Sequence, residues 1–346
     1  MIGQLYQARR IARIRYLLGG LIALAISVGI ALFSGDTPIS PSTLVKALLS
    51  SNDIAAERLL IVFMRIRAPR IMLAVVAGGS LGAAGALMQS VLGNPLASPF
   101  TLGVSSAAGF GASLAIVAGH SLLTNKLAIV GNAFVFAMGA NLIVYILAAS
   151  LGASPLLIVL AGMGINFLFS SLTTLLHYFS TPEAVYRALF WTAGSLSVSS
   201  WDSVLTLSIV FSISLILVLP ILYDLSLVVE GDAWATVVGV DVYKVRLTGL
   251  LIASVLAAVT VSFVGVIGFI GLVAPHLCRL TGMEDPRGLI PLSAITGGTL
   301  LVLADLTATR LATPIVLPIG AVTSLLGVAF LAAFALSKRR RMWMLA

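Results

Sequence analysis

Charged residues are scarce in this chain of 346 residues: they make up 9% of it, while hydrophobic residues make up 60%. Soluble globular domains carry about 25% charged residues, so the composition excludes a protein of that class. The mean hydropathy of +1.13 instead indicates an all-α polytopic membrane protein. Because no long hydrophilic segment interrupts the apolar runs, we expect one transmembrane domain over residues 1–346 and no soluble catalytic domain.

The residues that common catalytic and metal sites require are also missing. The single cysteine, Cys278, excludes a disulfide within the chain and a cysteine-based metal site, and we expect it to be a small buried residue. None of the four lysines follows a glycine, which excludes the Walker A loop that cradles ATP phosphates. The three histidines lie far apart in sequence. We therefore expect no catalytic residue, cofactor or metal on this chain.

Acidic residues are almost absent from the apolar runs. An ion-driven carrier usually needs a carboxylate inside the membrane, and the two candidates, Asp202 and Asp305, lie near the ends of predicted spans. An ion-coupled secondary transporter is therefore the less favoured alternative, and an intramembrane enzyme has no catalytic pair to support it. The chain is better explained as a conduit that has no energy source of its own.

What is present is a series of long apolar runs. A run of about 20 apolar residues can cross a bilayer, and an even number of spans places both termini on the same side. That side carries twelve of the 20 lysines and arginines, so we expect both termini in the cytoplasm. The ten predicted spans are 16–33, 70–91, 100–118, 127–150, 155–178, 203–223, 247–265, 267–280, 288–306 and 319–337.

The run from Ile71 to Leu92 is rich in small residues. Ala74, Gly78, Gly82 and Ala86 recur at every fourth position and share one helix face, which lets neighbouring membrane helices approach closely. We expect this span inside the bundle. Its polar residue, Gln89, either makes a hydrogen bond between helices or lies on a transport path.

The predicted outer face is unusually basic. Five of its eight lysines and arginines lie between Lys46 and Arg70, which favours an acidic partner outside the cell, although arginines that anchor span ends would give the same pattern. We also expect short helices near 42–50 and within 179–202, and an ion pair between Asp305 and Arg310.

Three cytoplasmic segments have functional patterns. The turns 92–99 and 152–154 are short and uncharged, which suits a constriction better than a docking surface. The segment 224–246 is longer, and its glycines bracket a predicted amphipathic helix from Asp232 to Val238 that carries Trp234. Because exposed tryptophans are enriched at protein–protein interfaces, we expect this helix to face a partner protein.

Several blocks, in order and over nearly the whole chain, resemble the permease subunits of bacterial ABC importers for iron–siderophore complexes, haem and cobalamin, the iron-chelate permease family. Any one block alone would be a weak signal, but together they are specific. The blocks are Arg67-Ala68-Pro69-Arg70, the glycine-rich span through Gln89, Asn94-Pro95-Leu96-Ala97 with Pro99, Leu102-Gly103, Gly268 to His276, Ala304-Asp305, Arg310, and Leu317-Pro318-Ile319-Gly320.

The resemblance implies a type II importer bundle of ten helices in the cytoplasmic (inner) membrane. It implies two permease subunits, as a homodimer or a heterodimer, with the path between them lined by the spans 155–178 and 319–337. It also implies two ATPase subunits that bind ATP and magnesium, a periplasmic or lipid-anchored substrate-binding protein, and no nucleic acid. The cargo implied is an iron–siderophore complex carried by alternating access, with haem or cobalamin as alternatives.

The resemblance also implies roles for particular residues. Those expected to dock the binding protein are Arg67, Arg70 and Arg310; those of the cytoplasmic gate are Asn94, Leu96, Gly152, Ala153 and Ser154; those that couple to the ATPase are Glu230, Gly231, Asp232, Ala233, Trp234, Ala235, Gly239 and Val240.

Overall fold

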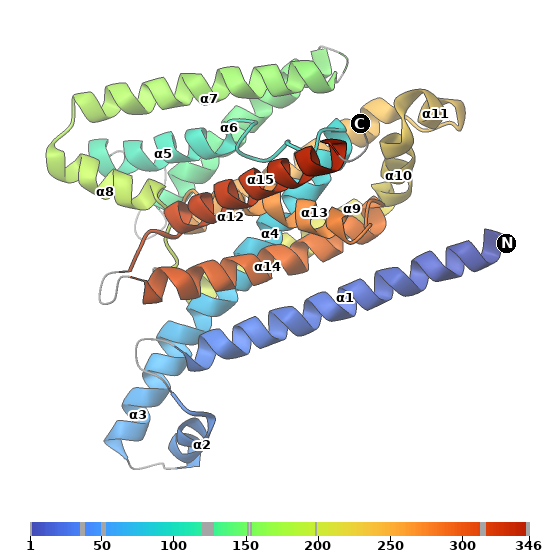
Figure 1. Ribbon diagram of the computed structural model, residues 1–346. Helices are drawn as coiled ribbons and strands as arrows, with labels where there is room; N and C mark the ends of the chain where they lie inside the picture. Colours follow the sequence, from blue (N-terminus) through green and yellow to red (C-terminus); the bar gives the residue numbers. More distant parts are fainter. Residues whose placement is uncertain are drawn as a thin grey trace.

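A computed structural model of the protein describes residues 2–34, 39–49, 53–119, 128–150, 152, 154–197, 199–311 and 316–343, and every regular element in these ranges is helical. Each of the ten predicted spans coincides with a helix, although several boundaries differ by a few residues (Figure 1). Seven helices are long and apolar enough to cross a membrane, and three apolar helices are shorter. The ten are α1 (Ile2–Phe33), α4 (Ala68–Leu92), α5 (Val104–Ala118), α6 (Ala128–Ser150), α7 (Pro155–Tyr178), α9 (Trp201–Val218), α12 (Val242–Val264), α13 (Ile270–Leu280), α14 (Pro286–Arg310) and α15 (Ile319–Trp343).

Helix α4 runs through the centre of the bundle, between α12, α13 and α14 (Figure 1). A Cβ atom at Gly78 or Gly82 would overlap backbone carbonyls of α14, and one at Gly85 would overlap the carbonyl of Gly271 in α13. The helices are therefore in backbone contact, as small residues permit in membranes. The prediction that this span lies inside the bundle is confirmed.

The outer end of α4 continues into a long extension. Before α4 lie α2 (Pro41–Leu49), α3 (Ile54–Ile61) and a π-helical segment, η1 (Val62–Arg67), so that one continuous helix runs from Ile54 to Leu92. Asp53 caps α3 by accepting a hydrogen bond from the Ala55 amide at 2.9 Å. The second predicted outer helix is α8 (Pro182–Thr192). Both short helices expected on this face are present.

The opposite end carries the termini of α1 and α15 together with the segment after α9 (Figure 1). The prediction that α9 ends near residue 223 is wrong, because a single 3-10 turn, η3 (Leu219–Ile221), leads directly into α10 (Leu222–Glu230). Leu225 and Val228 of α10 are buried in the core, which keeps this stretch helical. The predicted helix at 232–238 is α11 (Asp232–Val237), and Gly231 and Gly239 flank it with positive φ angles of 136° and 92°.

The chain unwinds between α12 and α13, as the glycine-rich sequence there predicts. Phe269 has a φ of 66° and is the one non-glycine residue with a positive φ among the described residues. The unwound stretch lies against the segment between α8 and α9, where the Ser195 amide donates to the Val264 carbonyl at 2.9 Å. Non-helical backbone at membrane depth requires such cover from protein.

The backbone contact between α4 and α14 gives a first prediction. Gly82→Val would force the two helices apart, and such overpacking costs about 1–3 kcal/mol or more of unfolding free energy. We expect a lower midpoint of thermal unfolding and a smaller yield of monodisperse protein in detergent. Gly139→Val in α6 is the matched control, because a Cβ at Gly139 meets nothing within 4 Å; an equal loss in both variants would contradict the assignment.

Candidate functional site

The structure brings together the three arginines that we expected to dock a binding protein. Arg67 at the end of η1 donates from Nη1 to the Leu32 carbonyl at 3.1 Å. Arg310 at the end of α14 donates to the Ser34 carbonyl from Nε at 3.2 Å and from Nη2 at 2.7 Å. Both guanidinium groups therefore sit at the carboxyl end of α1, where the last helix carbonyls lack partners and attract cations.

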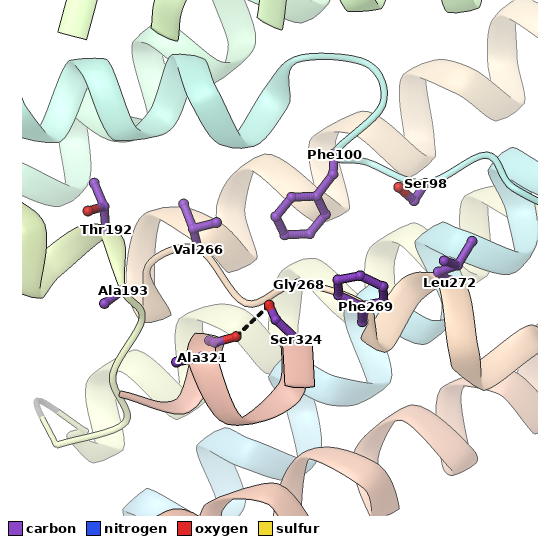
Figure 2. Close-up of a pocket in the computed structure, with 11 residues that line it drawn as sticks. Ser98, Phe100, Thr192, Ala193, Val266, Gly268, Phe269, Leu272, Ala321 and Ser324 are labelled. Atoms are coloured by element: carbon purple, nitrogen blue, oxygen red, sulfur yellow. Dashed lines mark hydrogen bonds between the residues drawn. The ribbon is translucent and has the colours of Figure 1, made fainter. Parts of the chain in front are cut away.

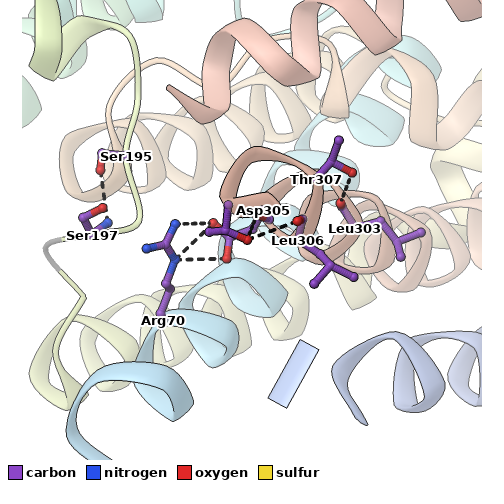
Figure 3. A network of polar contacts seen from close by, with 8 residues as sticks. Arg70, Ser195, Ser197, Leu303, Asp305, Leu306 and Thr307 are labelled. Atoms are coloured by element: carbon purple, nitrogen blue, oxygen red, sulfur yellow. Dashed lines mark hydrogen bonds and ion pairs between the residues drawn. The ribbon is translucent and has the colours of Figure 1, made fainter. Parts of the chain in front are cut away.

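Arg70, one turn after Arg67, makes an ion pair with Asp305 of α14 (Figure 3). Its Nη2 lies 2.8 Å from Oδ1, and its Nε lies 3.1 Å and 3.0 Å from Oδ1 and Oδ2. The predicted ion pair between Asp305 and Arg310 is therefore wrong. Residues five apart on a helix point to different sides, and Asp305 faces α4 while Arg310 reaches the end of α1. The charge of Arg70 is thus met within the chain.

The basic surface extends outwards along the helix that precedes α4. Arg58 of α3 and Arg65 of η1 are exposed. Trp201, at the start of α9, donates its indole N–H to the Met64 carbonyl at 2.9 Å. Short π-helical turns within helices often occur at functional sites.

At the cytoplasmic end, the predicted gate segment follows α4 directly. Gly93 ends the helix in a left-handed conformation with a φ of 56°. The Asn94 side chain then accepts a hydrogen bond from the Leu96 amide at 2.9 Å, which makes the tight turn typical of Asn-Pro. Leu96 at its tip is 59% exposed. An apolar side chain held at the tip of a rigid turn is suited to closing a passage.

The second predicted gate segment lies between α6 and α7. Gly152 is exposed and has a φ of 67°, and Ser154 is the N-cap residue of α7. Ala153 lies outside the described residues. The gating role of both segments stays a prediction.

Helix α11 presents an apolar surface away from the core. Ala235 is fully buried, whereas Trp234 and Val237 are 57% and 79% exposed. The Val240 amide donates to the Ala235 carbonyl at 2.9 Å, which folds the end of the segment back onto the helix. The residues expected to meet an ATPase therefore form one compact unit: Glu230, Gly231, Asp232, Ala233, Trp234, Ala235, Gly239 and Val240.

One side chain that we counted in the sequence only as a cytoplasmic charge proves to be central here. Arg246 of α12 donates from Nη2 to both carboxylate oxygens of Asp232, at 2.7 and 2.8 Å, and from Nε to the Val91 carbonyl at 3.1 Å. Sequence gave no signal for these contacts, because the partners lie 14 and 155 positions away.

Gln89 makes helix–helix hydrogen bonds, which was one of its two open interpretations. Its Nε2 lies 3.5 Å from the Gly271 carbonyl, and its Oε1 accepts from Arg279. Cys278 is 2% exposed, as expected. Within the ranges that the structure describes, no three His, Cys, Asp or Glu side chains are grouped closely enough to hold a metal ion.

A cavity of about 460 Å³ lies between α8, the unwound stretch before α13, and α15. Figure 2 shows Phe100 and Phe269 near each other on its walls, with the hydroxyls of Ser98, Thr192 and Ser324 around them. One of the two spans expected to line the path, α15, contributes to this cavity, whereas α7 contributes none of its lining residues. Its lining is mostly apolar and carries no charged side chain.

Comparisons with known proteins agree with this arrangement. The chain is 38% identical over 266 residues to the Fe(3+) dicitrate transport system permease protein FecD of Escherichia coli, covering 77% of this chain and 82% of that protein. It is 37% identical over 268 residues to the hemin transport system permease protein HmuU of Yersinia pestis, covering 77% and 80%. A solved structure described as an inward-facing ABC transporter assigned to the metal-chelate type matches with a TM-score of 0.80 and 28% identity, covering 93% of this chain and 99% of that one.

The family comparison covers most of the molecule. The model of the FecCD transport family matches residues 23–337, from within α1 to within α15. These limits include the outer arginines, both gate turns and α11. The chain therefore belongs to the FecCD transport family and is a multi-pass membrane permease of the ABC importer type.

Proposed function

We propose that this chain is the permease subunit of an ATP-driven importer that carries an iron–siderophore complex into the cytoplasm. The observation that carries the proposal is the pairing of two docking surfaces across one helix bundle. The arginine cluster lies at the outer end of α1, α4 and α14, and the apolar surface of α11 lies at the opposite end. Relatives named for Fe(3+) dicitrate and hemin transport support an iron chelate as cargo.

The energy for transport would come from partner chains. The sequence holds no Walker A loop, so ATP and magnesium would bind to two ATPase subunits that dock on α11. A second permease, identical or homologous, would complete the path. Coupling requires that ATP bind more tightly to one of the two conformations of the complex, because otherwise nucleotide binding could not shift the gate.

At the outer surface, a binding protein would deliver the cargo. Carboxylates on its lobes would meet Arg67 and Arg310, and the exposed Arg65 would add to the attraction. The contribution of Arg70 would differ, since its guanidinium already pairs with Asp305. We assign Arg70 the role of fixing the outer ends of α4 and α14 relative to each other.

An ion-driven carrier gains no support from these contacts. Asp305, the buried carboxylate that such a carrier would use, is held by Arg70, and Asp202 is exposed at the start of α9. Haem and cobalamin remain the alternative cargoes. Relatives named for them include the hemin permease described above and a cobalamin import permease of Halobacterium salinarum that is 36% identical over 266 residues.

The outer cluster gives a second prediction. Arg67→Glu combined with Arg310→Glu should weaken docking of the binding protein at least tenfold, which corresponds to about 1.4 kcal/mol, because like charges would then face each other. The affinity is measured with the permease complex in nanodiscs at low and physiological salt. Arg187→Glu, an exposed arginine on α8, is the control. Unchanged affinity in the double variant would refute the role of the cluster.

The apolar surface of α11 gives a third prediction. Trp234→Ala should weaken binding of the ATPase about thirtyfold or more, as truncation of a central interface tryptophan does. Tagged chain is purified from native membranes in mild detergent, and the co-purifying ATPase is quantified. Tyr186→Ala, an exposed aromatic residue of the outer helix α8 that is 63% exposed, should retain it. Failure of the unaltered chain to bring down any ATPase, even after cross-linking, would refute the proposed function.

The cargo assignment gives a fourth prediction. The binding protein that docks on this chain should bind a ferric siderophore more tightly than haem or cobalamin. Isothermal titration with ferric citrate, a ferric hydroxamate, haem and cobalamin compares the ligands directly. Tightest binding of cobalamin or haem would replace the iron–siderophore assignment with that alternative.

A further inference from the structure

The side chain of Arg246 spans a gap between two functional segments. A cavity of about 420 Å³ opens at the cytoplasmic end, with Gly93 and Pro95 of the gate turn on one side and Val229 and Gly231 beside α11 on the other. Arg246 lines this cavity and contacts both sides of it. One arginine side chain therefore contacts both segments across the cavity.

Each of the two contacts of Arg246 is placed where a guanidinium is strongly held. Val91 is in the last turn of α4, and its carbonyl has no partner in the next turn of helix. Asp232 is the first residue of α11, and its carboxylate is favoured there by the helix dipole. The charge-assisted bonds of 2.7 and 2.8 Å to Asp232 are of the stronger class. The planar fork of the guanidinium presents several donors in a fixed geometry, which holds both partners at once.

The two side chains of the ion pair between Arg246 and Asp232 differ in exposure. The Arg246 side chain is 11% exposed, while that of Asp232 is 50% exposed. The contact with α4 is therefore fixed inside the bundle, and the contact with α11 lies at the surface that a cytoplasmic partner reaches. The Arg246 side chain therefore joins the start of α11 to the base of the gate turn.

A second tether starts from the same turn of α12. Tyr243, three residues before Arg246 and thus on the same side of the helix, places its hydroxyl 3.4 Å from the Ala149 carbonyl near the end of α6. Helix α6 leads to the second gate turn at 152–154. The first turn of α12 therefore touches both helices that end at a gate turn, and through Arg246 it also touches α11.

We propose that Arg246 is the positioning residue that transmits the movement of α11 to the Asn94–Leu96 turn, with Tyr243 as a weaker tether to the second turn. The inference rests on the proposed function, because it assumes that an ATPase moves α11. It requires no contact between Arg246 and the cargo. Without this side chain, α11 would still receive the ATPase, but the gate turn would no longer follow it.

The test follows the gate turn directly and needs no knowledge of the cargo. A spin label is placed at Leu96→Cys in a Cys278→Ser background, within the complete complex of permease, ATPase and binding protein in nanodiscs. Its spectrum is compared without nucleotide and after trapping with ATP and vanadate. In Arg246→Met the nucleotide-dependent change should be mostly lost, while ATP hydrolysis per complex is largely retained.

Two further variants separate transmission from folding. Asp232→Asn alters the half-exposed partner and leaves the buried bond to Val91 in place. Its label response, measured per complex that has bound ATPase, should be mostly lost. Arg287→Met is the matched control, since Arg287 makes a separate ion pair with Asp285, with Nε 3.1 Å from Oδ2, and its side chain is more exposed than that of Arg246. Its response should equal that of the unaltered complex.

The outcomes distinguish the inference from the proposed function. A full label response in Arg246→Met and Asp232→Asn would overturn the inference alone. Parallel losses of hydrolysis and label response would also overturn it, since they indicate a merely structural role. If the unaltered complex shows no nucleotide-dependent change at Leu96, the proposed gating function fails, and the inference fails with it.

Discussion

Direct backbone contact between α4 and its neighbours is the constraint on which the rest of the bundle depends. In lipid, helices gain little from burying apolar side chains, so close van der Waals packing has to hold them together. Gly78, Gly82 and Gly85 allow this packing because any larger residue would strike a carbonyl of α13 or α14. The outer arginines, the gate turn and the contacts of Arg246 all attach to these closely packed helices, so their relative positions follow from the glycines.

Ion pairs between helices occur near both ends of the packed helices. Arg70 pairs with Asp305 on the outer side, and Arg246 pairs with Asp232 on the inner side. Removing one member of a partly buried pair leaves an unpaired charge, which costs more than the pair contributes. These pairs are better understood as devices that fix one helix relative to another than as sources of stability. Arg67 and Arg310 each donate to a backbone carbonyl at the end of α1.

Most of the fold could be predicted from the sequence, because apolar runs of membrane length are a strong local signal. The ten helices, the central position of α4 and the short helix α11 all follow from it. The continuation of α9 into α10 could not be predicted, since it depends on burial of Leu225 and Val228 by other helices. The pairing of Asp305 with Arg70, rather than with Arg310 nearby in sequence, likewise depends on which helix lies opposite. For the same reason the sequence did not reveal Arg246, whose partners are on distant segments.

The unbroken helix from Ile54 to Leu92 has a mechanical consequence. Its 39 residues span roughly 55–60 Å at about 1.5 Å per residue, nearly twice the thickness of the hydrocarbon core. One rod therefore begins beyond the outer membrane surface and ends at the Asn94 turn on the inner surface. Because the helix is continuous, a tilt of its outer end also displaces its inner end. Thermodynamic reciprocity then requires that an ATPase changes the affinity for a binding protein by the same factor as the binding protein changes the affinity for the ATPase.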